Sequence, residues 1–85
     1  MSEAPRKRPY TPNQIAKGKC FRCGAQAEFQ WSACADDNHW RLLCGPCDLE
    51  LNVMVVRWLG FKNWASKIKR YARRIGQKWS NPFTE

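Results

Sequence analysis

The period of the hydrophobic positions changes near residue 45 of this 85-residue chain. Every second position is apolar from Ala27 to Trp31, and residues 40–43, Trp-Arg-Leu-Leu, form a second β-prone run. Residues 34–38, Cys-Ala-Asp-Asp-Asn, lie between these runs and are rich in turn-forming side chains. A period of two in short runs joined by turn residues predicts a β-hairpin.

Helical patterns flank this hairpin on both sides. Thr11-Pro12-Asn13-Gln14 has the form of a capping box with proline at the first helical position, which predicts a short helix that runs to Lys17 and stops at Gly18. From Pro46 to Gly60 the period is helical, and Asp48 and Glu50 lie near the N-terminal end of the predicted helix, where acidic groups are favourable. The apolar residues of this helix are Leu49, Leu51, Val53, Met54, Val55, Val56 and Trp58.

A further amphipathic helix is predicted from Asn63, a good N-cap, to Ile75, with Gly76 at its end. At about 100° per residue its apolar and basic side chains fall on opposite faces. One face carries Trp64, Ile68, Tyr71, Ala72 and Ile75, and the other carries Lys67, Lys69, Arg70, Arg73 and Arg74.

Four of the five cysteines occur as two C-x2-C pairs, Cys20-Phe-Arg-Cys23 and Cys44-Gly-Pro-Cys47, with twenty residues between the pairs. This spacing is typical of four thiolates around one tetrahedral Zn²⁺ ion. Gly24 can adopt the positive φ that the turn after such a pair often needs. Two alternatives are a redox dithiol, which lacks the βαβ pattern expected beside it, and a set of buried cysteines without a metal.

Neither Cys34 nor the single histidine, His39, has a partner at two-residue spacing, so we leave both out of the predicted ligand set. The predicted fold is a small α+β zinc-bound domain in which a zinc knuckle, a β-hairpin and a helix follow one another, as in a treble-clef finger. Its expected organisation is a disordered basic arm at residues 1–10, a single zinc-finger domain with a C-terminal helix at 11–76, and a flexible tail at 77–85.

Residues 41–52, Arg-Leu-Leu-Cys-Gly-Pro-Cys-Asp-Leu-Glu-Leu-Asn, resemble the R-x-L-L-C-x-x-C-N-x-x-L segment of HNH nucleases of the recombination endonuclease VII type. The resemblance implies a treble-clef fold, a structural zinc ion, DNA binding and a bacterial or phage source. It also implies a catalytic stretch with two histidines, but this chain offers only Asp36, Asp37 and His39, which are out of register. Since Asp and Asn are common turn residues, we expect a turn here and keep the nuclease as an alternative.

The formal net charge of +8 is concentrated at the two ends of the chain. Residues 1–22 carry six basic side chains and one acidic one, and residues 51–84 carry eight basic side chains and no acidic one. Such an arrangement favours the phosphates of a nucleic acid, and we expect double-stranded DNA. The predicted phosphate-binding residues are Arg6, Lys7 and Arg8 in the arm and Lys67, Lys69, Arg70, Arg73, Arg74 and Lys78 near the C-terminus.

Five tryptophans in so short a chain call for an interpretation. We expect Trp58 and Trp64 in the core, Trp31 and Trp40 facing each other across the hairpin, and Trp79 exposed. A remaining alternative function is an adaptor that binds another protein, such as a nucleic-acid enzyme, through apolar side chains on a helix.

No apolar run is long enough to span a membrane, the longest aliphatic one being Val53–Val56. The first residues contain no apolar export segment, so we expect a cytoplasmic, reducing location without membrane partners.

Overall fold

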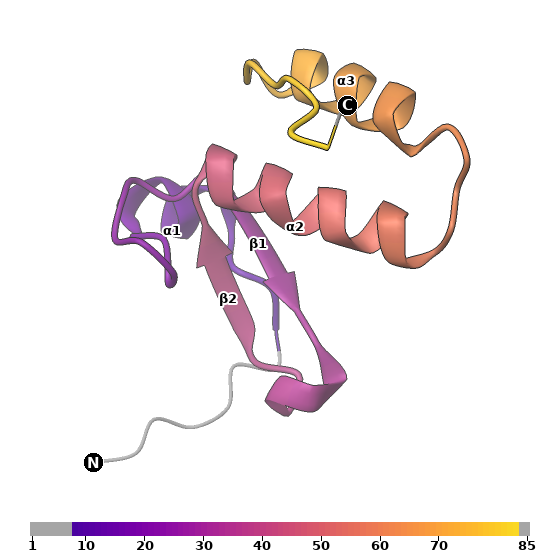
Figure 1. The fold of residues 1–85 in the computed structure, drawn as a ribbon. Helices are drawn as coiled ribbons and strands as arrows, with labels where there is room; N and C mark the ends of the chain where they lie inside the picture. The colour runs from indigo at the N-terminus through magenta and orange to yellow at the C-terminus, as the bar shows by residue number, and fades with distance from the viewer. Residues whose placement is uncertain (1–7, 84–85) are drawn as a thin grey trace. The chain divides into compact units, whose positions relative to one another are not determined.

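The computed structural model describes residues 8–83 and shows a small α+β arrangement of helices and one two-stranded antiparallel hairpin (Figure 1). The chain separates into two compact units, with the boundary between Cys47 and Asp48. The elements in chain order are α1 (Pro12–Lys17), β1 (Phe29–Ser32), the 3-10 turn η1 (Cys34–Asp36), β2 (Trp40–Leu43), α2 (Gly45–Trp58) and α3 (Trp64–Arg74). Across residues 8–83, no helix is both long and apolar enough to cross a membrane.

The predicted capping box at the start of α1 is confirmed. The Thr11 hydroxyl accepts a hydrogen bond from the Gln14 backbone N–H at 3.3 Å, and the Gln14 side chain accepts one from the Thr11 N–H at 2.9 Å. The helix ends at Gly18, as predicted. The two reciprocal bonds satisfy backbone donors that would otherwise lack a partner within so short a helix.

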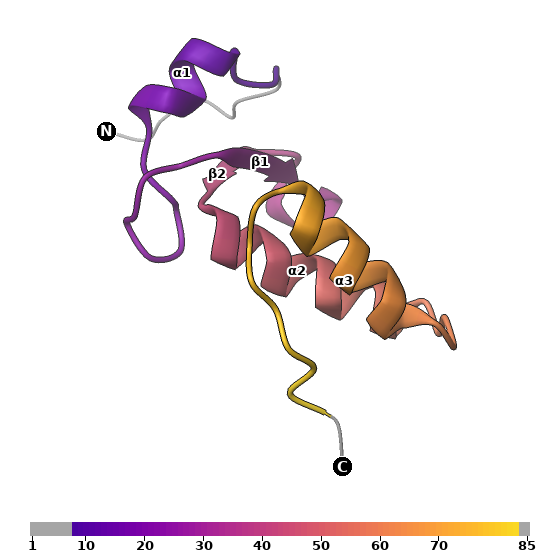
Figure 2. The same ribbon diagram turned by 90° about the horizontal axis from the view of Figure 1, so that it is seen from above.

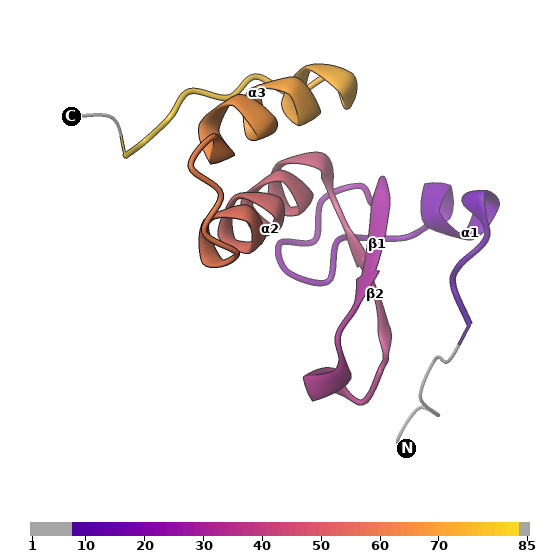
Figure 3. The ribbon, with the colours of Figure 1, turned by 90° about the vertical axis from the view of Figure 1, so that its right-hand side faces the viewer.

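The predicted hairpin is present, and the η1 turn lies in the loop that connects its two strands (Figure 3). Asp37 and Asn38 complete the turn with positive φ angles of 53° and 61°, which these residue types tolerate better than most. The register pairs Trp31 with Arg41 and Ser32 with Trp40. Directly opposed residues of a hairpin point to the same face, and successive residues along a strand point to alternate faces. Trp31 and Trp40 are one position out of register, so their side chains point to opposite faces. The prediction that they face each other was wrong.

In the second unit, α2 and α3 lie side by side (Figure 2). Leu49 and Val53 of α2 pack against Ile68 and Ala72 of α3, which are the apolar positions predicted for the two helices. Half-buried side chains extend this core; they are Val56, Trp64, Tyr71, Ile75 and Trp79. The core of this unit therefore consists of one face of each helix.

Two of the tryptophan predictions were wrong. Trp58 is 83% exposed rather than buried, because α3 covers only the side of α2 that carries Leu49. Nine positions at about 100° each place Trp58 on the opposite side. Trp79, which we expected to be exposed, packs on the core with its ring 6.0 Å from that of Trp64, whose core position is confirmed.

The end of the described chain makes contacts that the sequence did not predict. Phe83 lies edge-to-face against Trp64, with ring centroids 5.8 Å apart, and the Arg57 guanidinium lies 3.6 Å from the Phe83 ring centroid. Together with Trp79, these contacts hold residues 77–83 against the two helices. The predicted domain limits at residues 10 and 76 stay a prediction.

Candidate metal centre

The first cysteine pair lies in a tight backbone turn. Lys19 and Gln26 form an isolated antiparallel bridge, and inside it the Cys20 N–H donates to the Ala25 carbonyl at 2.7 Å. The Gly24 N–H donates back to the Cys20 carbonyl at 2.9 Å, and Gly24 has the positive φ of 81° that its position in the motif predicted. The turn brings the side chains of Cys20 and Cys23 to the same side.

The second pair lies at the start of α2. Cys44 immediately precedes the first helical residue, and Cys47 lies in the first turn. The Glu28 carboxylate accepts a hydrogen bond from the Gly45 N–H at 3.0 Å, which satisfies one of the free donors at this helix end. The Phe21 N–H donates to the Leu42 carbonyl at 2.8 Å and so attaches the first turn to β2, directly before the second pair.

These two attachments bring four sulfur atoms together. The Sγ atoms of Cys20, Cys23, Cys44 and Cys47 all lie within 4.8 Å of one another, and Cys23 Sγ and Cys44 Sγ are 3.5 Å apart. Sulfur ligands at about 2.3 Å from one tetrahedral ion are roughly 3.8 Å apart, which is close to this arrangement. All five cysteines are free thiols. The cluster therefore has the residues and the spacing of a four-sulfur metal site.

The cysteines of the cluster differ in their pKa. Burial acts to raise the pKa of Cys20, but hydrogen bonds from the backbone around Cys44, Cys23 and Arg22 outweigh it and lower that pKa to about 6. Burial and the neighbouring thiols raise the pKa of Cys47 to about 12, and burial raises that of Cys44. Four thiolates this close repel one another, and a bound divalent ion stabilises the ionised forms that bind it.

Within residues 8–83, the four cysteines form the only group of three or more cysteine, histidine or acidic residues with metal-site spacing. Cys34 is exposed in η1, and neither Cys34 nor His39 belongs to the group.

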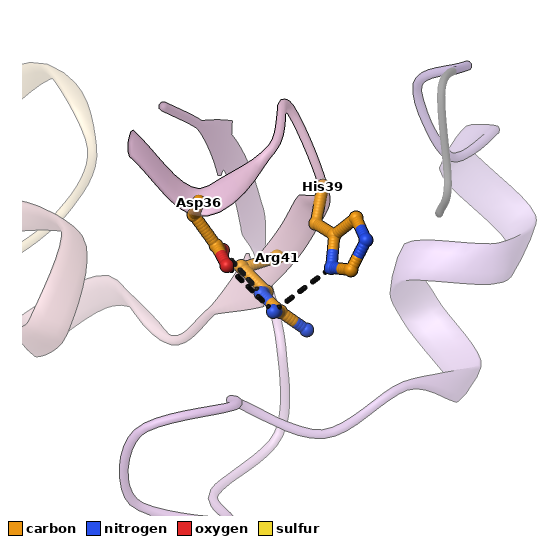
Figure 4. Close-up of polar contacts among 3 residues, drawn as sticks. All are labelled: Asp36, His39 and Arg41. Atoms are coloured by element: carbon orange, nitrogen blue, oxygen red, sulfur yellow. Dashed lines mark hydrogen bonds and ion pairs between the residues drawn. The ribbon is translucent and has the colours of Figure 1, made fainter. Parts of the chain in front are cut away.

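Two of the three residues considered for an alternative nuclease site, Asp36 and His39, lie beside Arg41 (Figure 4). The Asp36 carboxylate accepts two hydrogen bonds from Arg41, at 2.6 and 2.8 Å, and His39 Nδ1 lies 3.0 Å from Arg41 Nη2. The Arg41 guanidinium also lies 4.2 Å from the Phe21 ring centroid. The hydrogen bond that Arg41 donates to the Asp36 carboxylate is the largest cause of the lowered pKa of Asp36. Asp36 is thus used to fix the hairpin end, and Asp37 and His39 form no ligand cluster with it.

The predicted phosphate-binding residues fall into three groups. Arg6 and Lys7 lie outside the described residues, and Arg8 is exposed in the first unit. Lys69, Arg70, Arg73 and Arg74 are exposed on α3, and Lys67 is half-buried. Lys78 follows the helix and is exposed. The structure therefore places five of the predicted cations on one helix, and four of them are exposed.

Two polar groups that position these elements were missed by the sequence analysis. Glu28 binds the start of α2, and the buried Asp48 accepts hydrogen bonds from the Tyr71 hydroxyl and from Asn52. Two of these three contacts, Glu28 with Gly45 and Asp48 with Tyr71, join residues more than fifteen positions apart, so no local pattern in the sequence indicates them.

Comparisons with protein-family models, curated proteins and solved structures find no match for this chain. The four-cysteine centre and the cationic helix are accordingly the features on which a function has to be based.

Proposed function

We propose that the four-cysteine centre binds Zn²⁺ and that the fold around it is a treble clef. The order of the elements supports this, because a turn with two cysteines, a hairpin and a helix that begins at the second pair follow one another. Zinc is the ion that four thiolates at tetrahedral spacing most commonly hold in structural sites. Bound there, it acts as a cross-link between the first turn and the start of α2.

We further propose that the protein binds double-stranded DNA through phosphates and does not cut it. The observation that carries this proposal is the exposed cationic side of α3, in a segment, residues 51–83, that contains no acidic residue. A surface needed only for solubility usually mixes both charges. Arg8, together with Arg6 and Lys7, adds a second basic segment that can contact DNA.

The test is an electrophoretic mobility shift with a duplex of about 20 base pairs at several salt concentrations. Each neutralised phosphate releases counterions, so affinity is expected to fall steeply as salt rises. Binding that does not depend on salt, or no binding at low salt, contradicts the proposal.

The absence of cleavage is supported by the contacts of Asp36, whose carboxylate is paired with Arg41. Incubation of supercoiled plasmid with the protein and Mg²⁺ or Mn²⁺ is expected to leave the plasmid intact. Cleavage that is lost in a His39→Ala variant would instead support the nuclease that the resemblance implies.

A protein-binding adaptor is a second candidate, and one observation favours it. Met54 and Trp58 are 56% and 83% exposed on the side of α2 away from α3. Exposed apolar side chains that lie together often mark protein interfaces. Copurification of one stoichiometric protein partner, lost in a Trp58→Ala variant, would support this function.

A further inference from the structure

A hollow of about 480 Å³ lies between α2 and α3 in the second unit. Its apolar lining includes Val56, Ile68 and the ring of Tyr71, and its basic lining consists of Lys67, Arg70 and Arg74. No carboxylate lines it. A volume of this size is within the range of small-ligand sites. The hollow therefore offers an apolar surface and three positive charges to the same occupant.

The aromatic wall of the hollow is fixed in position by buried polar contacts. The Tyr71 hydroxyl donates a hydrogen bond to the buried Asp48 carboxylate, and the Asn52 side-chain amide donates to the Asp48 backbone carbonyl at 2.8 Å. Burial, followed by the contact with Asp48, raises the pKa of Tyr71 to about 12. A ring held in this way presents a preformed surface on which a flat group can stack.

Two of the three cations lie beside aromatic rings. The Lys67 ammonium is 4.5 Å from the Phe61 ring centroid, and the Arg74 guanidinium is 5.4 Å from that of Tyr71. Basic side chains next to aromatic rings are the usual composition of surfaces that bind unpaired nucleotides, where bases stack and phosphates pair with cations. A site for phosphate alone would require only the basic side chains, and a site for an apolar ligand would require only the apolar ones, whereas this hollow has both.

We propose that the hollow receives one unpaired nucleotide of the bound nucleic acid, with its base against Val56 and Tyr71 and its phosphate on the basic side chains. The proposal rests on the proposed nucleic-acid binding and adds a preference within it. A base inside an intact duplex is stacked between its neighbours and has to be extruded at a cost, whereas a bulged base has already lost its pair. The protein should therefore prefer DNA with an unpaired nucleotide.

The experiment compares three duplexes of equal length and charge density by fluorescence anisotropy at constant salt. One is fully paired, one carries a single bulged nucleotide, and one carries a bulged abasic residue at the same position. Because stacking of one base on an aromatic side chain contributes roughly five- to a hundredfold in affinity, the bulged duplex should bind at least about fivefold more tightly than the paired one. The abasic bulge should lose this gain.

Two matched variants of adjacent α2 residues locate the site. Val56→Trp fills the hollow without changing any charge and should abolish the preference for the bulge while leaving affinity for the paired duplex unchanged. Val55→Trp adds the same side chain at a residue that does not line the hollow, and should keep the preference. Far-UV circular dichroism checks that both variants fold, and the comparison of bulged and abasic DNA on the unmodified protein decides the question without any variant.

The outcomes separate this inference from the proposed function. Equal, salt-dependent binding of all three duplexes overturns the inference and leaves DNA binding intact. Loss of the preference in Trp58→Ala but not in Val56→Trp also overturns it, because the base would then stack elsewhere. No binding of any duplex refutes the proposed function itself.

Discussion

The first unit, up to Cys47, contains very little apolar core apart from its cysteines. Among its described residues, the buried hydrophobic side chains other than cysteine are Ala27 and Leu43. In the second unit, by contrast, Leu49 and Val53 pack against residues of α3. If the four-cysteine centre holds zinc as proposed, we predict that removal of the ion unfolds the hairpin and the first cysteine turn, while α3 and the part of α2 packed on it stay helical.

The expected size of the effect follows from the number of metal–sulfur bonds that the geometry allows. Four thiolates at these separations make a complete structural site, and binding of zinc to such sites in small fingers contributes about 10–16 kcal/mol near neutral pH. A whole domain is commonly stable by only about 5–15 kcal/mol. The free energy lost with the ion should consequently be at least as large as the free energy of unfolding of the first unit.

The assay is the amide NMR spectrum of ¹⁵N-labelled protein before and after treatment with a strong chelator, with metal content measured by elemental analysis. Amide signals of β1 and β2 should collapse to unfolded positions, and those of α3 should remain dispersed. Cys47→Ser should reproduce the chelated spectrum, whereas Cys34→Ser, which alters the cysteine outside the cluster, should not. Cross-strand contacts between Trp31 and Arg41 that persist in metal-free protein would refute the reasoning.

Three further predictions concern α3. Replacing Lys69 and Arg73 by Gln removes two predicted phosphate contacts. The slope of log binding constant against log salt concentration, measured by fluorescence anisotropy with duplex DNA, should therefore become shallower by about 1.8. An unchanged slope would contradict the phosphate role of these two residues. Tyr71→Phe should lower the free energy of unfolding in urea by about 1.5–3 kcal/mol because the buried Asp48 carboxylate loses a donor, and an unaffected midpoint would show that this bond adds no stability. Since burial raises the pKa of Tyr71 to about 12, above its ordinary value near 10, its neutral form contributes stability that is complete below about pH 10 and disappears as pH rises through 12. Denaturation curves measured across that range should show the loss, and Tyr71→Phe should lack it.

Much of the local structure could be read from short-range patterns. The hairpin strands and the two long helices were indicated by the period of their apolar residues, and the short helix α1 by its capping box at Thr11. The predicted N-cap of α3, Asn63, makes no side-chain capping hydrogen bond. The register of the hairpin was less accessible. It depends on a turn with two positive-φ residues, Asp37 and Asn38, and this turn places Trp31 and Trp40 on opposite faces.

The tryptophans show the same limit for helices. A helix with apolar residues on opposite sides, as α2 has at Leu49 and Trp58, does not indicate which side will be covered. The position of α3 decides that Leu49 is buried and Trp58 is exposed. Trp79 lies beyond the last helix, where no periodic pattern exists, yet its ring packs on Trp64.

The sequence by itself determined which four cysteines form the cluster and which helix is cationic, because both depend on spacing along the chain. Only the tertiary structure decided that Asp36 is paired with Arg41, that Asp48 is bound by Tyr71, and that an apolar hollow lies beside the cations of α3. The physical reason is that a side chain's hydrogen-bond partner and its burial depend on residues distant in the chain, whose positions follow from how the helices and strands pack.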